Sequence, residues 1–140
     1  MKKTDSVRTP LHITNYLQKN FFKNDVMWDP TPYNEKFSPE KDRCGLKSAW
    51  YSPSFCNPPY SICQKFIRKA YSEFKNFGVK SILLIKSQHL SSKFCKEIQS
   101  EFRVKMFSEK IRFAPYEYKA RFISILLFFG YESEPTFEII

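Results

Sequence analysis

The sequence predicts one α/β domain over residues 1–140, a three-layer sandwich around a mostly parallel sheet with an antiparallel edge. Two observations predict this class. Apolar residues recur at intervals of three and four over residues 62–77, which is typical of an amphipathic helix. An unbroken apolar run over residues 81–85 follows between Lys80 and Lys86, and such a run suits a strand buried on both faces of a parallel sheet. The length of 140 residues is enough for one domain with a sizeable core.

The N-terminal third predicts one helix, one strand and a loop. Pro10 suits the start of a helix, and apolar side chains follow it at near-helical spacing over residues 10–23. Residues 25–29 form a predicted short strand that ends at Asp29-Pro30. Residues 30–49 are rich in Pro, Asn, Lys and Ser, and a long loop is predicted over residues 30–52. Loops of this length in compact domains usually bind something or move, so we expect a substrate or cofactor lid.

The middle of the chain predicts a strand–helix–strand unit. Residues 50–56 lead as a strand into Asn57-Pro58-Pro59-Tyr60, the helix over residues 62–77 ends at Gly78, and the buried strand over residues 81–85 follows. Asn57 is therefore expected at the carboxyl end of a parallel strand, where open α/β sheets bind ligands. The remaining predicted elements are a helix over residues 91–101 and strands over residues 103–107, 110–113 and 121–129.

The tetrapeptide Asn57-Pro58-Pro59-Tyr60 has the chemistry to hold a planar amine. Its two prolines remove two backbone donors and favour an extended conformation at Asn57. The side-chain carbonyl of Asn57 and the backbone carbonyl of Pro58 can then accept both hydrogens of an exocyclic amino group. Tyr60 offers an aromatic surface, on which stacking of a base is worth about 1–3 kcal/mol. The same residues also suit a Pro-Pro turn that only ends a strand, with Tyr60 packed on the core.

The motif belongs to a series of short segments along the chain. In sequence order they are Thr9-Pro10, Trp28-Asp29-Pro30 with Asn34, Gly45-Leu46 with Trp50, residues 55–61, and Lys110-Ile111-Arg112-Phe113. Together they resemble the phage-type DNA N6-adenine methyltransferases, the Dam-like family, over roughly residues 7 to 129. The resemblance implies a class I methyltransferase-like, Rossmann-like sheet and methyl transfer from S-adenosylmethionine to the N6 amine of adenine in DNA. It also implies a minimal core, because the chain is short for a methyltransferase with its own target-recognition domain.

The resemblance assigns roles to individual residues. The implied catalytic residues are Asn57, Pro58, Pro59 and Tyr60; the implied cofactor-binding residues are Thr9, Pro10, Asp29, Pro30 and Asp42; the implied nucleic-acid-binding residues are Ser61, Lys110 and Arg112. Alternative roles stay open: a helix cap for Thr9-Pro10, a strand-ending turn for Asp29-Pro30 and an exposed strand arginine for Arg112. The chain departs from the family pattern at Cys44, where an acidic residue is usual, and Asp42 is the candidate substitute. Its three glycines form no Gly-x-Gly loop.

The charge of the chain favours a polyanionic partner. The net charge is +9 and the isoelectric point is near 9.4, and Lys and Arg side chains supply most non-specific affinity for nucleic acids. The expected partner is DNA, with RNA left open, and a basic rim near residues 105 to 121 would contact its backbone. The basic residues form no single block, so a solvated lysine-rich surface is the alternative.

No metal site and no membrane segment are expected. The cysteines at positions 44, 56, 63 and 95 form no Cys-x-x-Cys pair, and they predict small buried thiols in a reducing compartment. No stretch approaches the ~18 apolar residues of a membrane span, and no apolar signal region opens the chain. We therefore expect a cytoplasmic protein, in the host cell if the origin is phage or viral as the family implies.

Three classes of function remain open at this point. The first is an adenine-N6 methyltransferase acting on DNA. The second is a degenerate methyltransferase fold that serves as a nucleic-acid-binding subunit, suggested by Cys44 and the missing glycine loop. The third is a structural component of a larger assembly, as a partner subunit or a homo-oligomer, suggested by the many aromatic residues and the apolar tail at residues 137–140.

Overall fold

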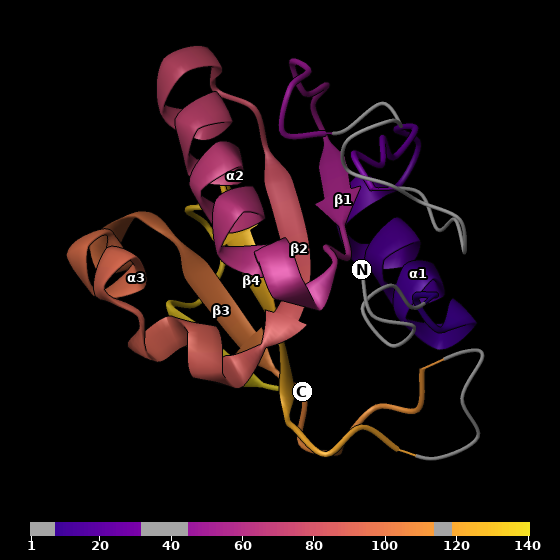
Figure 1. Cartoon of the computed structure of the whole chain (residues 1–140). Coiled ribbons are helices and arrows are strands. Elements are labelled where there is room, and N and C mark those ends of the chain that lie inside the picture. Colours follow the sequence, from indigo (N-terminus) through magenta and orange to yellow (C-terminus); the bar gives the residue numbers. More distant parts are fainter. Residues whose placement is uncertain (1–7, 32–44, 114–118) are drawn as a thin grey trace.

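The core of the fold is a five-stranded sheet in the order β1-β2-β4-β3-β5 (Figure 1). The computed structural model describes residues 8–31, 45–113 and 119–140. The strands are β1 (Ser54–Cys56), β2 (Ser81–Lys86), β3 (Arg103–Met106), β4 (Ser124–Phe129) and β5 (Phe137–Ile139). β1 pairs with β2 and β3 pairs with β5 in parallel, whereas β4 is antiparallel to both of its neighbours. Four strands therefore share one direction, which confirms a mostly parallel sheet.

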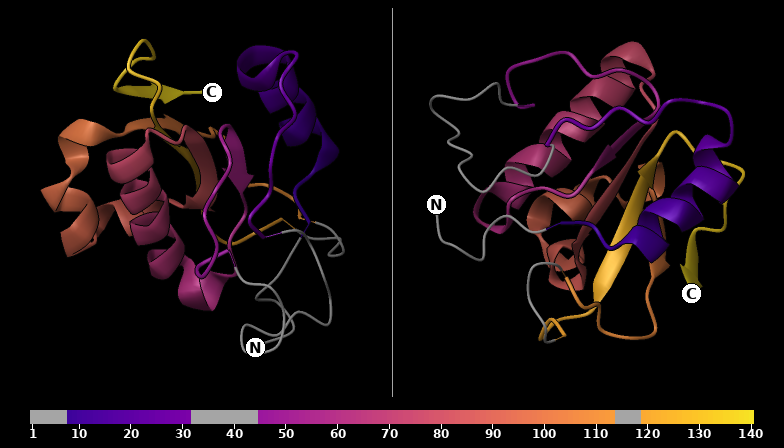
Figure 2. Two further views of the ribbon diagram at one scale, coloured as in Figure 1. Left: turned by 90° about the horizontal axis from the view of Figure 1, so that it is seen from above. Right: turned by 90° about the vertical axis from the view of Figure 1, so that its right-hand side faces the viewer.

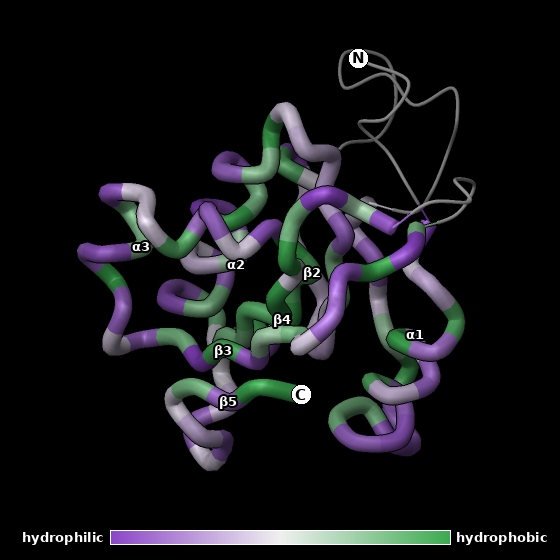
Figure 3. The backbone as a smooth tube through the Cα atoms, turned by 90° about the horizontal axis from the view of Figure 1, so that it is seen from below, coloured by the Kyte–Doolittle hydropathy of each residue, from purple (hydrophilic) through white to green (hydrophobic). Residues whose placement is uncertain are grey.

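The antiparallel strand lies in a different place from the one predicted. β4 is not at an edge but between β2 and β3, and the edges are β1 and β5. The reason is burial, since all six residues of β4 are buried and a strand this apolar is stable only with a neighbour on each side and a layer on each face. Hydrophobic colouring accordingly follows β2 and β4 (Figure 3).

Helices cover both faces of the sheet, as the three-layer prediction requires (Figure 2). α2 (Cys63–Phe77) and α3 (Lys93–Glu97) pack on one face, where their side chains join Leu83, Ile85 and the alternate residues of β4 in one core cluster. α1 (Leu11–Leu17), extended by a π-helical turn to Phe22, packs on the other face with Ile82 and Leu84. Successive side chains of a strand point to opposite faces, so β2 and β4 contribute to both clusters.

The predicted βαβ unit is confirmed. The amphipathic pattern forms α2 after a 3₁₀ turn over Tyr60–Ile62, and Gly78 ends the helix with φ +68°, a left-handed conformation that side chains other than glycine rarely adopt. β1 and β2 are parallel neighbours, and α2 connects them. Asn57 therefore directly follows the last residue of β1, at the carboxyl edge of the sheet.

Several predicted elements are shorter or absent. Residues 25–29 and 110–113 form only isolated bridges, Trp28 with Ser54 and Arg112 with Lys119. Val26 is 88% exposed, so burial does not stabilise a longer strand there. The strand predicted over residues 50–56 is reduced to β1, and the helix predicted over residues 91–101 is interrupted at Ile98. The apolar tail, which suggested a structural role in a larger assembly, forms β5 of the chain's own sheet, and Phe137 and Ile139 remain exposed.

Part of the predicted loop over residues 30–52 lies outside the described residues, which resume at Gly45. Residues 45–53 lead into β1 without a regular element. Within the part of the chain that the structure describes, no helix is both long enough and apolar enough to cross a membrane.

Candidate active site

Two predicted site segments leave the sheet side by side. The backbone N–H of Phe55 donates to the carbonyl of Trp28 at 2.9 Å, and the N–H of Trp28 donates to the carbonyl of Pro53 at 3.1 Å. This single parallel bridge aligns residue 28 with β1. Asp29-Pro30 and Asn57-Pro58 consequently emerge next to each other at the carboxyl edge of the sheet, the position where open α/β sheets bind ligands.

Thr31 connects the Asp29-Pro30 turn to the Asn57 motif. Its backbone N–H donates to Oδ1 of Asp29 at 2.7 Å, and its hydroxyl lies 3.4 Å from the same oxygen. That hydroxyl also lies 3.3 Å from Sγ of Cys56 and 3.4 Å from the backbone carbonyl oxygen of Asn57. The turn is therefore fixed against the start of the motif by one short side chain.

The Asn57 side chain is oriented by Thr9. Nδ2 of Asn57 donates to Oγ1 of Thr9 at 3.1 Å, across 48 positions of sequence. An amide whose nitrogen is held in this way presents its carbonyl oxygen in the other direction. The helix cap considered for Thr9-Pro10 is confirmed for Pro10, which is the residue that precedes α1, whereas Thr9 provides no side-chain cap. Pro10 itself acts at the helix start, where its carbonyl accepts from the N–H groups of Ile13 and Thr14.

Asp29 is the titratable group at the centre of this site. Burial raises the pKa of its carboxyl from 3.8 to about 6, and the hydrogen bonds from Thr31 oppose the rise. A carboxylate removed from water without a paired cation is destabilising for the fold, and a positively charged ligand would relieve that cost. Such a group, at the edge of a sheet, is a candidate for ligand binding.

Gly45 makes a close approach to the same turn. A Cβ atom at position 45 would lie 2.6 Å from the carbonyl oxygen of Pro30 and 2.7 Å from its Cβ. Both distances are shorter than the van der Waals contacts of Cβ atoms in proteins. Nε1 of Trp50 donates to the Gly45 carbonyl at 2.8 Å and holds the glycine in place. Glycine therefore contributes to the Asp29-Pro30 turn through a contact 15 positions away along the chain, not through a Gly-x-Gly loop.

The motif ends in an aromatic and cationic cluster. Pro58 and Pro59 are buried, whereas Tyr60 is half-buried and meets Phe122 edge to face, with 5.6 Å between the ring centroids. Nζ of Lys86 lies 4.6 Å from each of these two centroids. Sequence reasoning missed Lys86 and Phe122. The available signal for Lys86 was its place at the end of β2, beside the end of β1 that leads to Asn57.

A comparison with protein families now bears on this geometry. The model of the family described as DNA N-6-adenine-methyltransferase (Dam) matches residues 1–123. The chain belongs to this family. The matched residues include Thr9, Asp29 and Asn57 and end immediately before β4. Comparisons with curated proteins and with solved structures give no match.

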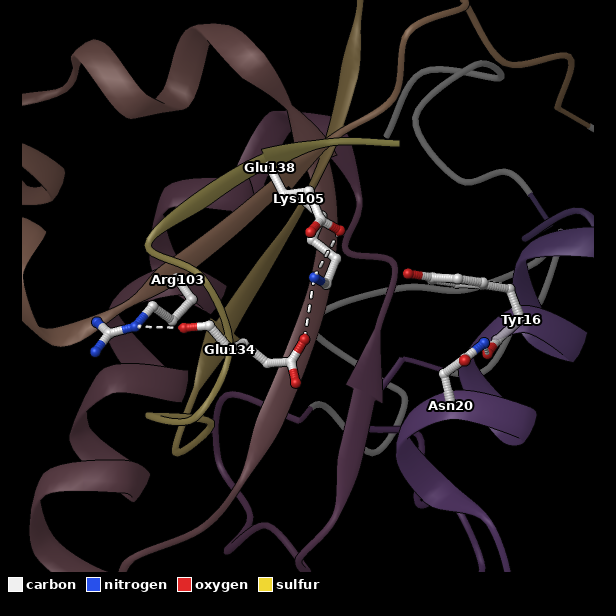
Figure 4. Close-up of polar contacts among 6 residues, drawn as sticks. All are labelled: Tyr16, Asn20, Arg103, Lys105, Glu134 and Glu138. Atoms are coloured by element: carbon white, nitrogen blue, oxygen red, sulfur yellow. Dashed lines mark hydrogen bonds and ion pairs between the residues drawn. The ribbon is translucent and has the colours of Figure 1, made fainter.

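Of the residues predicted to contact nucleic acid in this Dam-family chain, some are exposed in the structure and one is buried. Ser61, Lys110 and Arg112 are exposed. Lys105, expected in the basic rim, is only 4% exposed and pairs with Glu134 at 3.0 Å and Glu138 at 3.1 Å (Figure 4). The rim prediction is wrong for Lys105, because its side chain lies on the α1 face of β3, between carboxylates from the C-terminal segment. Asp42 and Cys44 lie outside the described residues.

The cysteines of the described residues are buried thiols. In the described part of the chain, Cys56, Cys63 and Cys95 are buried and none of them forms a disulfide. Burial raises the pKa of Cys63 to about 12, so its thiol stays protonated and unreactive at neutral pH. Over residues 8–31, 45–113 and 119–140, no group of three or more His, Cys, Asp or Glu side chains is arranged to hold a metal ion.

Proposed function

We propose that this chain transfers a methyl group from S-adenosylmethionine to the exocyclic N6 amine of adenine in DNA. Membership of the Dam family supports adenine methylation of DNA. The single structural observation that carries the finer assignment is the fixed Asn57 amide, held by Thr9 at 3.1 Å beside the Asp29 turn. It places an oriented acceptor beside the turn that carries the half-buried carboxylate of Asp29, at one edge of the sheet.

The amine would be held by acceptors alone. With Nδ2 of Asn57 directed to Thr9, Oδ1 of Asn57 and the carbonyl of Pro58 accept the two hydrogens of the adenine amino group. Prolines at positions 58 and 59 offer no competing N–H donor. Binding both hydrogens turns the nitrogen lone pair toward the methyl donor and makes the amine a better nucleophile. Tyr60 supplies the stacking surface, worth about 1–3 kcal/mol for a base.

The residues of the Asp29 turn fit S-adenosylmethionine. A half-buried carboxylate with a raised pKa, beside the Thr31 hydroxyl, suits the ammonium or ribose hydroxyl groups of that cofactor. The chain has no Gly-x-Gly loop, and the close contact of Gly45 with Pro30 packs against the Asp29-Pro30 turn instead. Asp29 and Pro30 are thus the cofactor-binding residues that we propose, together with Asp42. When bound, the cofactor supplies a methyl group on a positively charged sulfur, which needs no metal to leave.

The chain's own contribution to the reaction is then positioning. Reactive groups that are held in line react as if at very high concentration, which accounts for about 7–11 kcal/mol in well-oriented systems. A base in duplex DNA must first leave its stack, which costs a few kcal/mol. The positive charge of the chain, +9, favours the backbone contacts that offset this cost.

The decisive experiment measures cofactor binding and methyl transfer on the same preparations. Calorimetric titration should show binding of S-adenosylmethionine, and label should pass to adenine-containing DNA. Asn57→Ala should abolish transfer while the unfolding transition and cofactor binding persist, because the amide contacts the amine and not the fold's core. Asn76→Ala, an exposed amide on α2, is the matched control and should transfer normally.

Each alternative function has its own outcome in this experiment. Salt-sensitive DNA binding without any cofactor binding would identify a degenerate member of the family. A stable monomer that transfers label would exclude a purely structural role. Full transfer by Asn57→Ala would refute the assigned site, even if the wild-type enzyme is active.

A further inference from the structure

A second site lies on the α2/α3 face, in an open groove of about 520 Å³. Its walls come from α2, from the 3₁₀ turn η3 (Ser87–Ser91) after β2, and from the start of α3. The lining includes Gln64, Arg68, Gln88, His89, Lys93 and Phe94, with two serines, and it contains no carboxylate. A groove lined by cations, amides and hydroxyls, without an acid, suits an anionic ligand.

The cationic side chains of this groove are not neutralised. Among the described residues, the ion pairs are made by Lys69, Lys75 and Lys105, and neither Arg68 nor Lys93 has a carboxylate partner. The guanidinium of Arg68 lies 4.3 Å from the ring centroid of Phe94. Stacking on an aromatic face leaves the N–H groups at the edge of the guanidinium available to a ligand and limits their motion. Arg68 is thus a preorganised donor for an oxyanion.

His89 adds a neutral donor. Nε2 of Gln64 lies 2.8 Å from Nδ1 of His89, and since an amide nitrogen can only donate, Nδ1 is the acceptor. The proton of the neutral ring is then on Nε2 of His89. Burial, and next the charge of Lys86, lower the pKa of His89, so the ring is neutral at pH 7.

The groove begins where the proposed base site ends. Gln64 is in the first turn of α2, directly after the 3₁₀ turn that starts at Tyr60. Lys86, three positions before His89, carries its ammonium 4.6 Å from the Tyr60 ring centroid. β1 and β2 are parallel neighbours, so the motif after β1 and the η3 turn after β2 lie at the same edge of the sheet.

We propose that this groove binds the phosphodiester backbone of DNA next to the nucleotide whose base enters the Asn57 site. This inference rests on the proposed function for its placement of the base. Arg68 and Lys93 neutralise phosphate charge, and the amide and hydroxyl side chains donate to the phosphate oxygens. Contacts of this kind position the DNA without reading its sequence.

The test compares DNA affinity of matched charge variants at several salt concentrations. Arg68→Gln and Lys93→Gln should each make the slope of log K against log salt shallower by about 0.9, equivalent to roughly eightfold weaker binding near 0.1 M salt. Lys65→Gln and Lys96→Gln remove the same charge from exposed positions of α2 and α3 outside the groove, and should change binding less than twofold by rough estimate. Lys93→Gln leaves the Arg68–Phe94 contact intact, so it serves if Arg68→Gln does not fold.

The outcomes separate the groove from the proposed reaction. Equal effects of groove and control variants, or wild-type protein that does not bind DNA, would overturn the groove assignment. Calorimetric binding of inorganic phosphate that Arg68→Gln abolishes, with unchanged DNA affinity, would assign the groove to a small anion instead. If wild-type protein binds DNA through Arg68 but fails to bind S-adenosylmethionine, the methyl-transfer proposal fails while the groove stands.

Discussion

Asp29 is expected to destabilise the fold at neutral pH. Its carboxyl has a pKa of about 6 in the folded chain against 3.8 as the ordinary value. Between these two values the folded protein binds more protons than the unfolded one, so the free energy of unfolding falls as pH rises from about 4 to 6. With 1.36 kcal/mol for each pKa unit, keeping Asp29 ionised at pH 7 costs about 3 kcal/mol.

The substitution Asp29→Asn tests this reasoning. The variant keeps an oxygen for the Thr31 N–H but has no titration, so its stability relative to wild type should rise by about 2–3 kcal/mol between pH 4 and pH 7. Any fixed cost of burying the new amide nitrogen cancels in this difference between pH values. Urea unfolding followed by tryptophan fluorescence measures it, since Trp28 adjoins the turn. Asp25→Asn, an exposed carboxylate on the same segment, should follow wild type.

The same variant should lose affinity for S-adenosylmethionine in calorimetry, because the proposed ligand for the cofactor's polar groups is gone. A stability difference that stays constant between pH 4 and pH 7 would refute the account of Asp29 as a partly desolvated charge. Gain of stability together with loss of binding would show that the chain retains this carboxylate for function and not for folding.

Two further predictions concern side chains whose partners are distant in sequence. Thr9→Val should slow single-turnover methyl transfer about 2- to 10-fold, because one hydrogen bond worth about 0.5–1.5 kcal/mol no longer orients Asn57. Thr9→Ser keeps the hydroxyl and should restore the rate. Full activity of Thr9→Val would contradict the positioning role. Lys105→Met should lower the free energy of unfolding, measured in urea, by about 1–3 kcal/mol, because Lys105 pairs with Glu134 and Glu138 inside the fold. For the same reason the variant should leave the salt dependence of DNA binding unchanged. A shallower dependence of DNA affinity on salt would restore the prediction that Lys105 belongs to the basic rim.

The elements that the sequence predicted correctly are those with a strong local signal. The period of α2, the left-handed Gly78 after it and the apolar run of β2 each depend on residues close together in the chain. The strand at residue 28 and β5 carry no such signal. The first is one isolated bridge, and the second is a three-residue strand whose side chains are all exposed. Pairing with a distant neighbour forms them, so a reading of local pattern misplaces or misses them.

The candidate site shows the same division. The motif at residues 57–60 was predicted from residue type, because prolines and a strand end constrain the backbone locally, whereas a site role for Asp29-Pro30 was implied by the family resemblance. The contacts of Asn57 with Thr9, of Gly45 with Pro30 and of Lys86 with Tyr60 depend on how segments 15 to 48 positions apart are packed. Sequence spacing carries little information about such contacts.

By itself the sequence determined the strand–helix–strand unit, the acceptor-rich motif at its turn and the excess of positive charge, since periodicity, proline geometry and composition act within a few residues or over the whole chain. Only the tertiary structure decided which basic residues are available to a ligand. It buried Lys105 between two glutamates and left Arg68 stacked on Phe94 without a carboxylate partner among the described residues. Charge is a property of the residue, but its compensation depends on which distant groups the folded chain brings within a few ångströms.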